Sequence, residues 1–162
     1  GKKVIAFKPN NDNRFAEDEI VSRLGQKMKA ISINQIINEN LKEEILKLSN
    51  GCHIVAFDEA QFFSEKIVDI VSEIASYGSH VIIAGLDLDF RGKPFGHMGE
   101  LMTIADEVIK NTAYCPCCGR PARFTQRLVD GLPAKEGPIE LVGDIEKYEP
   151  RCRNCYVPPY KA

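Results

Sequence analysis

Two pairs of cysteines constrain the fold of this chain more than any other feature. Cys115 and Cys118 are separated by two residues, and Cys152 and Cys155 repeat that spacing further along. A C-x-x-C turn supplies two thiolates at once, and four thiolates complete a tetrahedral shell around Zn²⁺. The sequence therefore predicts a zinc site made by these four residues. All four positions of the shell would be filled by protein, so we expect a structural role and look for the chemistry elsewhere.

The remaining cysteines have other interpretations. Cys117 lies inside the first turn and is the alternative ligand, while Cys52 precedes an apolar run and is most simply a core thiol. The N-terminus shows no signal-peptide pattern, and no apolar stretch reaches the ~20 residues that span a bilayer. We therefore expect a cytoplasmic protein without membrane contact, in which disulfides are disfavoured.

Apolar runs that alternate with helical patterns predict the fold class. Strands are expected over residues 4–7, 53–57 and 81–86, with an edge strand over 29–33 and a further strand beginning at 108–109. Helices are expected over 34–48, capped by Asn34, over 64–77 and over 99–105. This order predicts an α/β fold: a mostly parallel sheet with helices on both faces, and ligands at the carboxyl ends of its strands.

From about residue 112, Gly, Pro and Cys become frequent and the alternation ends. We expect an α/β domain over residues 1–111 and a small zinc-binding β domain over 112–162. A zinc ribbon that binds nucleic acid is one alternative for the second domain. The formal charge of −2 argues against it, because such binding needs a concentrated basic face.

Two carboxylates follow the second apolar strand. Asp58 stands where an acidic residue in nucleotide-binding folds holds Mg²⁺ beside phosphates, and Glu59 could then act as a general base. The alternative is a pair of solvated loop carboxylates. Phe62 and Phe63 come next, either as a platform on which a nucleobase stacks or as core residues.

Six segments taken together resemble the type II thymidine kinases of bacteria and animal cytosol. The similarity runs in order along nearly the whole chain, through Phe7-Lys8-Pro9 with Asp12-Asn13-Arg14, Asp58-Glu59-Ala60-Gln61-Phe62-Phe63, Ala84-Gly85-Leu86-Asp87, Arg91-Gly92-Lys93-Pro94-Phe95-Gly96, Thr125-Gln126-Arg127-Leu128, and Tyr148-Glu149-Pro150-Arg151-Cys152 with Cys155.

The resemblance implies a P-loop-kinase-like core over 1–111 and a zinc-binding lasso domain over 112–162. The implied reaction transfers the γ-phosphate of ATP to the 5′-hydroxyl of thymidine, giving dTMP for nucleotide salvage and DNA synthesis. Glu59 matches the general base, Asp58 the Mg²⁺-associated acid, and Arg14 a cation near the phosphates. Phe62 matches the ring that stacks on thymine. Further nucleoside-binding positions are matched by Leu86, Phe90, Phe95, Thr125, Ile139, Leu141 and Tyr148.

One element of the family is absent from this sequence. The chain contains no G-x-x-x-x-G-K-[ST] motif, whose backbone amides cradle nucleotide phosphates. We expect a strand, P-loop and helix to precede Gly1, and a catalytically silent relative without a P-loop is the alternative. The resemblance also implies a homotetramer, feedback by dTTP, and no nucleic-acid partner.

Overall fold

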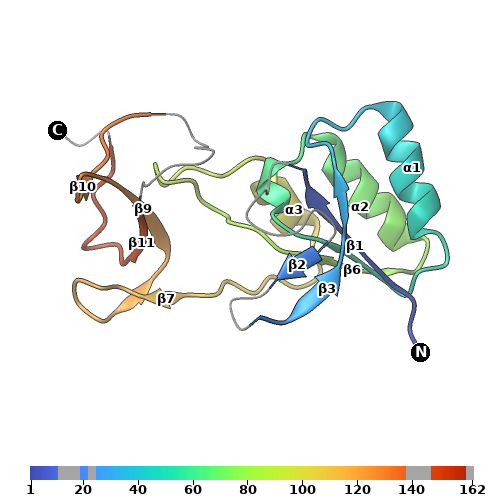
Figure 1. Ribbon diagram of the computed structural model, residues 1–162, viewed down its shortest axis with the longest axis horizontal. Coiled ribbons are helices and arrows are strands. Elements are labelled where there is room, and N and C mark those ends of the chain that lie inside the picture. The colour runs from blue at the N-terminus through green and yellow to red at the C-terminus, as the bar shows by residue number, and fades with distance from the viewer. Residues whose placement is uncertain (11–18, 22–24, 138–146, 160–162) are drawn as a thin grey trace. The chain divides into compact units, whose positions relative to one another are not determined.

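The structure is a computed structural model that describes residues 1–10, 19–21, 25–137 and 147–159 (Figure 1). The chain forms two compact units. Unit 1 comprises Gly1–Leu86 and Gly96–Ala105, and unit 2 comprises Asp87–Phe95 and Asp106–Ala162. The short segment Asp87–Phe95 therefore belongs to unit 2, although unit 1 precedes and follows it in the sequence.

A four-stranded parallel sheet forms the centre of unit 1. Its strands, in spatial order, are β4 (Ile31–Ile33), β1 (Val4–Pro9), β5 (Ile54–Phe57) and β6 (His80–Ile83). Every pairing is parallel, so the carboxyl ends of the strands meet at one edge. The mostly parallel sheet with helices that the sequence predicts is confirmed, and the placement of helices on both of its faces stays a prediction.

Within the described residues, three α-helices accompany this sheet: α1 (Glu39–Ser49), α2 (Lys66–Ser76) and α3 (Met98–Ile104). Asn38 caps α1, because its side chain accepts a hydrogen bond from the backbone N–H of Leu41 at 2.9 Å. The prediction that Asn34 caps this helix is wrong. The Asn34 side chain instead accepts from the N–H of Ile36 at 2.9 Å and forms a separate turn before the helix.

The apolar core lies on one face of the sheet. Val55 and Phe57 are fully buried there, and the Phe57 ring stacks on Phe7 with 5.2 Å between ring centroids. Helices α1 and α2 lie side by side and contribute Ile45 and Ile70 to the same cluster (Figure 1). Burial of large apolar side chains contributes about 1.5–3 kcal/mol each, so this cluster is the main source of stability in unit 1.

Two expected strands differ from the observed ones. The edge strand expected over 29–33 is divided: Lys27–Lys29 forms β3, which pairs antiparallel with β2 (Glu19–Val21), and Ile31–Ile33 alone joins the parallel sheet as β4. The strand expected at 108–109 is not formed. Val108 and Ile109 are exposed, and no strand of the described chain pairs with them, so their backbone lacks the hydrogen-bonding neighbour that a strand requires.

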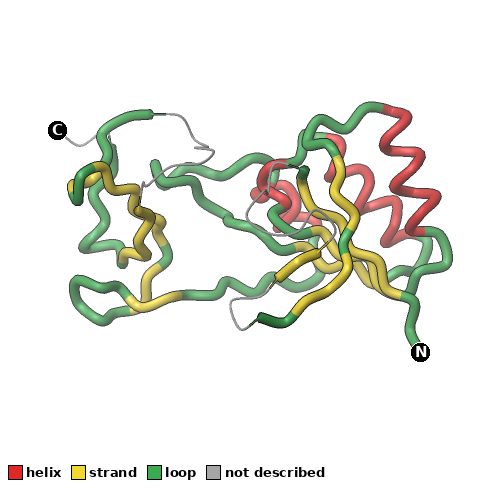
Figure 2. Tube along the Cα trace, in the orientation of Figure 1, coloured by secondary structure: helices red, strands yellow, loops and turns green. Residues whose placement is uncertain are grey.

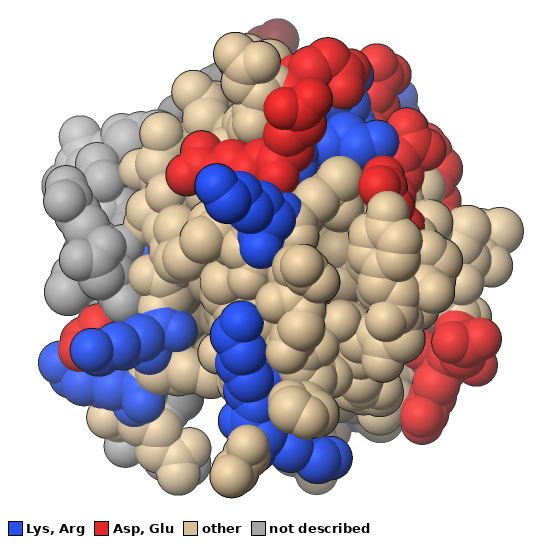
Figure 3. Space-filling view, turned by 90° about the vertical axis from the view of Figure 1, so that its right-hand side faces the viewer, with Lys and Arg blue, Asp and Glu red and all other residues tan. Residues whose placement is uncertain are grey.

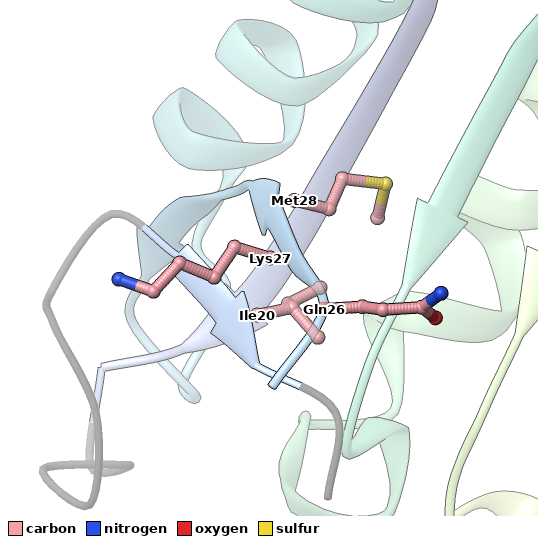
Figure 4. A pocket seen from close by; sticks show the side chains of 4 residues that line it. All are labelled: Ile20, Gln26, Lys27 and Met28. Carbon is pink, nitrogen blue, oxygen red and sulfur yellow. The ribbon is translucent and has the colours of Figure 1, made fainter. Parts of the chain in front are cut away.

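The β2–β3 hairpin lies beside the C-terminal half of β1. Lys8 is 2% exposed, and its ammonium donates to the carbonyl oxygen of Glu19 at 2.9 Å. An open hollow of about 580 Å³ on this hairpin is lined by Ile20, Gln26, Lys27 and Met28 (Figure 4). The Lys27 side chain extends away from Met28 and pairs with Glu19 at 2.8 Å. None of the site residues predicted from the sequence lines this hollow.

Unit 2 is built of short strands and loops, whereas the three helices described lie in unit 1 (Figure 2). A hairpin of β7 (Ala113–Tyr114) and β8 (Pro121–Ala122) carries the first cysteine pair at its tip. A second sheet has the order β10 (Leu132–Pro133), β9 (Phe124–Val129) and β11 (Lys147–Arg151), with both pairings antiparallel. Among the described residues, no helix is long and apolar enough to cross a bilayer.

Segment Asp87–Phe95 is held to the rest of unit 2 through Phe90, which is 3% exposed. The guanidinium of Arg127 lies over the Phe90 ring, 5.1 Å from its centroid. The hydroxyl of Tyr156 donates to the Phe90 carbonyl at 2.8 Å, and the Tyr156 ring stacks on Phe124 at 4.6 Å. One aromatic residue thus joins this segment to β9 and to the C-terminal part of the chain.

Candidate functional site

The four predicted cysteines converge in unit 2. The sulfur atoms of Cys115, Cys118, Cys152 and Cys155 all lie within 4.8 Å of one another. Cys118 lies 3.5 Å from Cys152 and 3.6 Å from Cys155, measured between sulfur atoms. A tetrahedral Zn²⁺ with Zn–S bonds of about 2.3 Å separates its sulfur ligands by about 3.8 Å. The sulfur cluster therefore fits a zinc ion.

Both cysteine pairs of this cluster form the same kind of backbone turn. The carbonyl of Cys115 accepts from the N–H groups of Cys118 and Gly119, at 3.3 and 2.8 Å. The carbonyl of Cys152 accepts from Cys155 and Tyr156 in the same way, at 3.1 and 2.9 Å. This repeated turn explains why a two-residue spacing brings both sulfur atoms of a pair to the same point.

The pKa values of two thiols of the cluster are shifted in opposite directions. Backbone N–H groups, that of Cys152 foremost, lower the pKa of Cys115 to about 6. Hydrogen bonds to Cys118 and Cys152 raise the pKa of Cys155 to about 12. Cys117 is exposed and lies outside the cluster of four, where its sulfur accepts a hydrogen bond from Arg151.

The acidic pair lies at the carboxyl end of β5, in unit 1. The N–H of Asp58 continues the sheet pairing by donating to the carbonyl of Phe7 at 2.9 Å. One carboxylate oxygen of Asp58 accepts from the N–H of Glu59 at 3.0 Å. Glu59 has φ 49° and ψ 42°, in the left-handed region, and precedes a 3₁₀ turn over Ala60–Phe62. Both carboxylates are half-buried, so each keeps a path to solvent or to a ligand.

Gln61 is the residue here that the sequence did not single out. It is 3% exposed, and its amide nitrogen donates to Glu59 Oε2 at 2.6 Å. Its amide oxygen accepts from the N–H of Leu86 at 3.1 Å. The sequence did contain a signal for this role: Gln61 is a polar residue two positions after the proposed general base, and glycines follow at positions 85 and 96.

The predicted nucleoside-binding residues are distributed over both units. Leu86 follows β6 in unit 1 and is 47% exposed, and Phe62 is half-buried in the 3₁₀ turn. In unit 2, Phe90 is buried beneath Arg127, and Phe95 is half-buried. Thr125 and Tyr148 stand on the paired strands β9 and β11, near each other in register. Arg14, Ile139 and Leu141 lie outside the described residues.

The Asp58 carboxylate suits a Mg²⁺ ion in its donor chemistry. Hard divalent cations prefer carboxylate oxygens, and Mg²⁺ in nucleotide sites is held through one or two carboxylates together with phosphates. Asp58 offers such oxygens at the carboxyl edge of a parallel sheet, where ligands of open α/β sheets bind. If bound there, Mg²⁺ would neutralise phosphate charge.

The charged side chains on one face of the molecule are dispersed (Figure 3). On the face shown in Figure 3, Lys and Arg side chains stand in separate groups with Asp, Glu and uncharged atoms between them. Exposed basic residues also form ion pairs, such as Lys110 with Asp87 at 2.9 Å. This face offers no continuous basic surface for a phosphate backbone.

One comparison with known proteins covers nearly the whole chain. A family model described as thymidine kinase matches residues 1–156. The match includes both units, the acidic strand end and all four cysteines of the cluster.

Proposed function

The chain belongs to the thymidine kinase family, and from this premise we propose that it transfers the γ-phosphate of ATP to the 5′-hydroxyl of thymidine, with Glu59 as the general base. Family membership supports a nucleoside kinase that takes thymidine and ATP and serves nucleotide salvage. The observation that carries the finer proposal is the pair of half-buried carboxylates at the carboxyl end of β5.

In the proposed reaction, Glu59 accepts the proton of the 5′-hydroxyl as that oxygen attacks the γ-phosphorus. The bond from the γ-phosphorus to the bridging oxygen breaks, ADP leaves, and dTMP forms. Phosphoryl transfer depends mainly on positioning and charge neutralisation, so a base fixed next to a metal-type carboxylate is the contribution required of the protein. Asp58 is suited to hold the Mg²⁺ that accompanies ATP.

The remaining site residues have supporting roles in this proposal. Phe62 would stack on thymine, with Leu86, Phe90 and Phe95 around it. Arg14 would approach the phosphates. The segment between the cysteine pairs would bind the base through Thr125, Ile139, Leu141 and Tyr148, with its two ends tied together by the zinc site. A cytoplasmic homotetramer under dTTP feedback belongs to the same proposal, on family resemblance alone.

Glu59→Gln in the full-length protein tests the base. The amide keeps the size of the side chain but cannot accept the proton, so we expect kcat to fall by about 10²–10⁴-fold. Thymidine affinity, measured by calorimetry, should stay within about twofold, because the substitution removes proton acceptance in the transition state and leaves the contacts that bind thymidine. Deoxycytidine serves as the comparator substrate.

Glu65→Gln is the matched control, since Glu65 is an exposed glutamate at the start of α2. It should leave kcat unchanged. Full turnover by Glu59→Gln, or loss of thymidine binding with normal turnover, would exclude Glu59 as the base.

A further inference from the structure

We propose that Gln61 is the positioning residue of the site: its side-chain amide fixes the direction of the Glu59 carboxylate and ties it to the loop that follows β6. The proposal rests on Glu59 being the general base. It starts from a glutamine that is 3% exposed and has both ends of its amide engaged.

The orientation of the amide follows from its partners. The backbone N–H of Leu86 can only donate, so the atom that meets it at 3.1 Å must be the amide oxygen. The NH₂ group then faces Glu59 Oε2, at 2.6 Å. A flipped amide would place a donor against the N–H and an acceptor against the carboxylate, and would lose both hydrogen bonds.

Two glycines make room for this arrangement. A Cβ atom at position 85 would lie 2.5 Å from the amide oxygen of Gln61, and a Cβ at position 96 would lie 2.1 Å from its backbone oxygen. Both distances are far shorter than van der Waals contact. Gln61 is therefore enclosed from two sides, and the backbone of Ala60 is held as well, by a 3.0 Å hydrogen bond from its N–H to the carbonyl of Ala84.

The chemical consequence concerns the freedom of Glu59. A half-buried glutamate can rotate about three side-chain bonds, and a general base is effective only within hydrogen-bond reach of the proton that it takes. By holding Oε2, Gln61 sets the direction in which the other oxygen points. Misplacement of a catalytic group by about 1 Å costs about 10²-fold in rate, which is the scale of effect expected from losing this hydrogen bond.

The bridge also joins two strands. Glu59 follows β5 and Leu86 follows β6, and Gln61 contacts both residues. Leu86 is one of the residues proposed to bind the base of the nucleoside. A shift of the loop at Leu86 would therefore move Gln61, which is the hydrogen-bond partner of the proposed general base, Glu59.

Two substitutions in the full-length protein test the proposal. Gln61→Met keeps the approximate size and removes both hydrogen bonds, so we expect kcat to fall by about 10–100-fold while the Kd for thymidine changes by less than about twofold. Gln61→Glu keeps an acceptor for Leu86 and replaces the donor to Glu59 by a second carboxylate. If Gln61 positions Glu59, kcat should be lower for Gln61→Glu than for Gln61→Met. If Gln61 only holds the loop at Leu86, kcat should be higher for Gln61→Glu than for Gln61→Met.

Gln35→Met is the matched control in the same unit. Gln35 is half-buried, and its amide nitrogen has no hydrogen-bond partner among the described residues. The same exchange there should leave kcat unchanged.

A double-mutant cycle with Glu59→Gln separates this proposal from the proposed function. If Gln61 acts through Glu59, Gln61→Met should cost little further rate once Glu59 is already replaced. An equal loss in both backgrounds would overturn the positioning role, and so would normal turnover by both Gln61 variants. If Glu59→Gln alone retains full turnover, the proposed base is wrong and the positioning role fails with it.

Discussion

The two units of this chain are stabilised by different means. In unit 1, three helices and a parallel sheet share one apolar cluster that includes Phe7, Phe57 and Ile70, each almost fully buried. In unit 2, the cluster around the cysteines contains Cys115, Ala122 and Cys152, with Cys155 packed against it. Its four cysteines could hold a metal ion, so we expect unit 2 to depend on a bound metal, whereas unit 1 depends on burial of apolar side chains.

The buried polar groups show the same contrast. In unit 2, Gln126 is 1% exposed and makes hydrogen bonds with both backbone groups of Val157, at 2.8 and 3.2 Å. These contacts fix local geometry and contribute little net stability, because water offers equivalent partners in the unfolded chain. In unit 1, the buried Gln61 faces the acidic pair instead. Unit 1 thus carries the carboxylates of the proposed chemistry, and unit 2 carries the four cysteines that could hold a metal.

Removing the metal should have the largest effect on stability, and that effect should be confined to unit 2. Structural zinc sites contribute about 10–16 kcal/mol of apparent binding free energy, which is also folding free energy where no preformed site exists. We expect chelation, or Cys152→Ser, to abolish protection of unit 2 against hydrogen exchange while α2 and β5 stay protected. Cys117→Ser is the control, since Cys117 lies outside the cluster. Unit 2 would not be metal-dependent if its protection survived complete loss of zinc.

A cavity in the apolar core should have the next largest effect, confined to unit 1. Ile70 on α2 is 0% exposed, and Ile70→Ala should lower the free energy of unfolding by about 2–5 kcal/mol in urea titrations. Zinc content should not change. Ile36→Ala is the control, because Ile36 is 77% exposed and its truncation should cost less than about 0.5 kcal/mol. Release of zinc by Ile70→Ala would mean that the two units share one cooperative core.

Loss of a surface ion pair should have the smallest effect on the free energy of unfolding. The direction in which this effect changes with pH follows from the pKa shifts of the pair. The hydrogen bond and charge of Lys66 lower the pKa of Glu39, and Glu39 raises the pKa of Lys66. A carboxyl whose pKa is lowered on folding stabilises the protein above its ordinary value of 4.5, and this contribution disappears as the pH falls through the lowered value.

Glu39→Gln should therefore shift the urea midpoint slightly at pH 7 and not at all in strong acid, because exposed pairs contribute little. Glu43→Gln on the same helix is the control, and its midpoint at pH 7 should stay that of the unmodified protein. A large shift for Glu39→Gln at pH 7 would show that unit 1 depends on charge as well as burial.

The sequence was a good guide wherever local pattern decides structure. The apolar runs that became β1, β5 and β6 were recognisable because both their period and their boundaries are local. The cysteine spacing likewise encodes a turn that needs only a few residues. The start of α1 was misplaced because Asn34 and Asn38 are both competent caps, and only packing against the sheet decides between them.

The rest of the site depends on contacts between distant parts of the chain. The bond from Gln61 to Leu86 requires β5 and β6 to be neighbours, and the close approach of Gly96 to Gln61 joins residues far apart in sequence. The expected strand at 108–109 failed for the same reason, since β pairing is a property of two segments. Segment Asp87–Phe95 belongs to unit 2 and makes long-range contacts there, such as that of Phe90 with Arg127, which no local pattern reveals.

The left-handed backbone of Glu59 has a consequence for the evolution and engineering of this protein. A non-glycine residue in that conformation costs about 1–2 kcal/mol, which glycine would avoid and asparagine would reduce. A library screened for heat resistance alone would thus favour replacement of this residue, and would discard the proposed proton acceptor among its first gains. Any search for a hardier variant has to select for turnover in the same round.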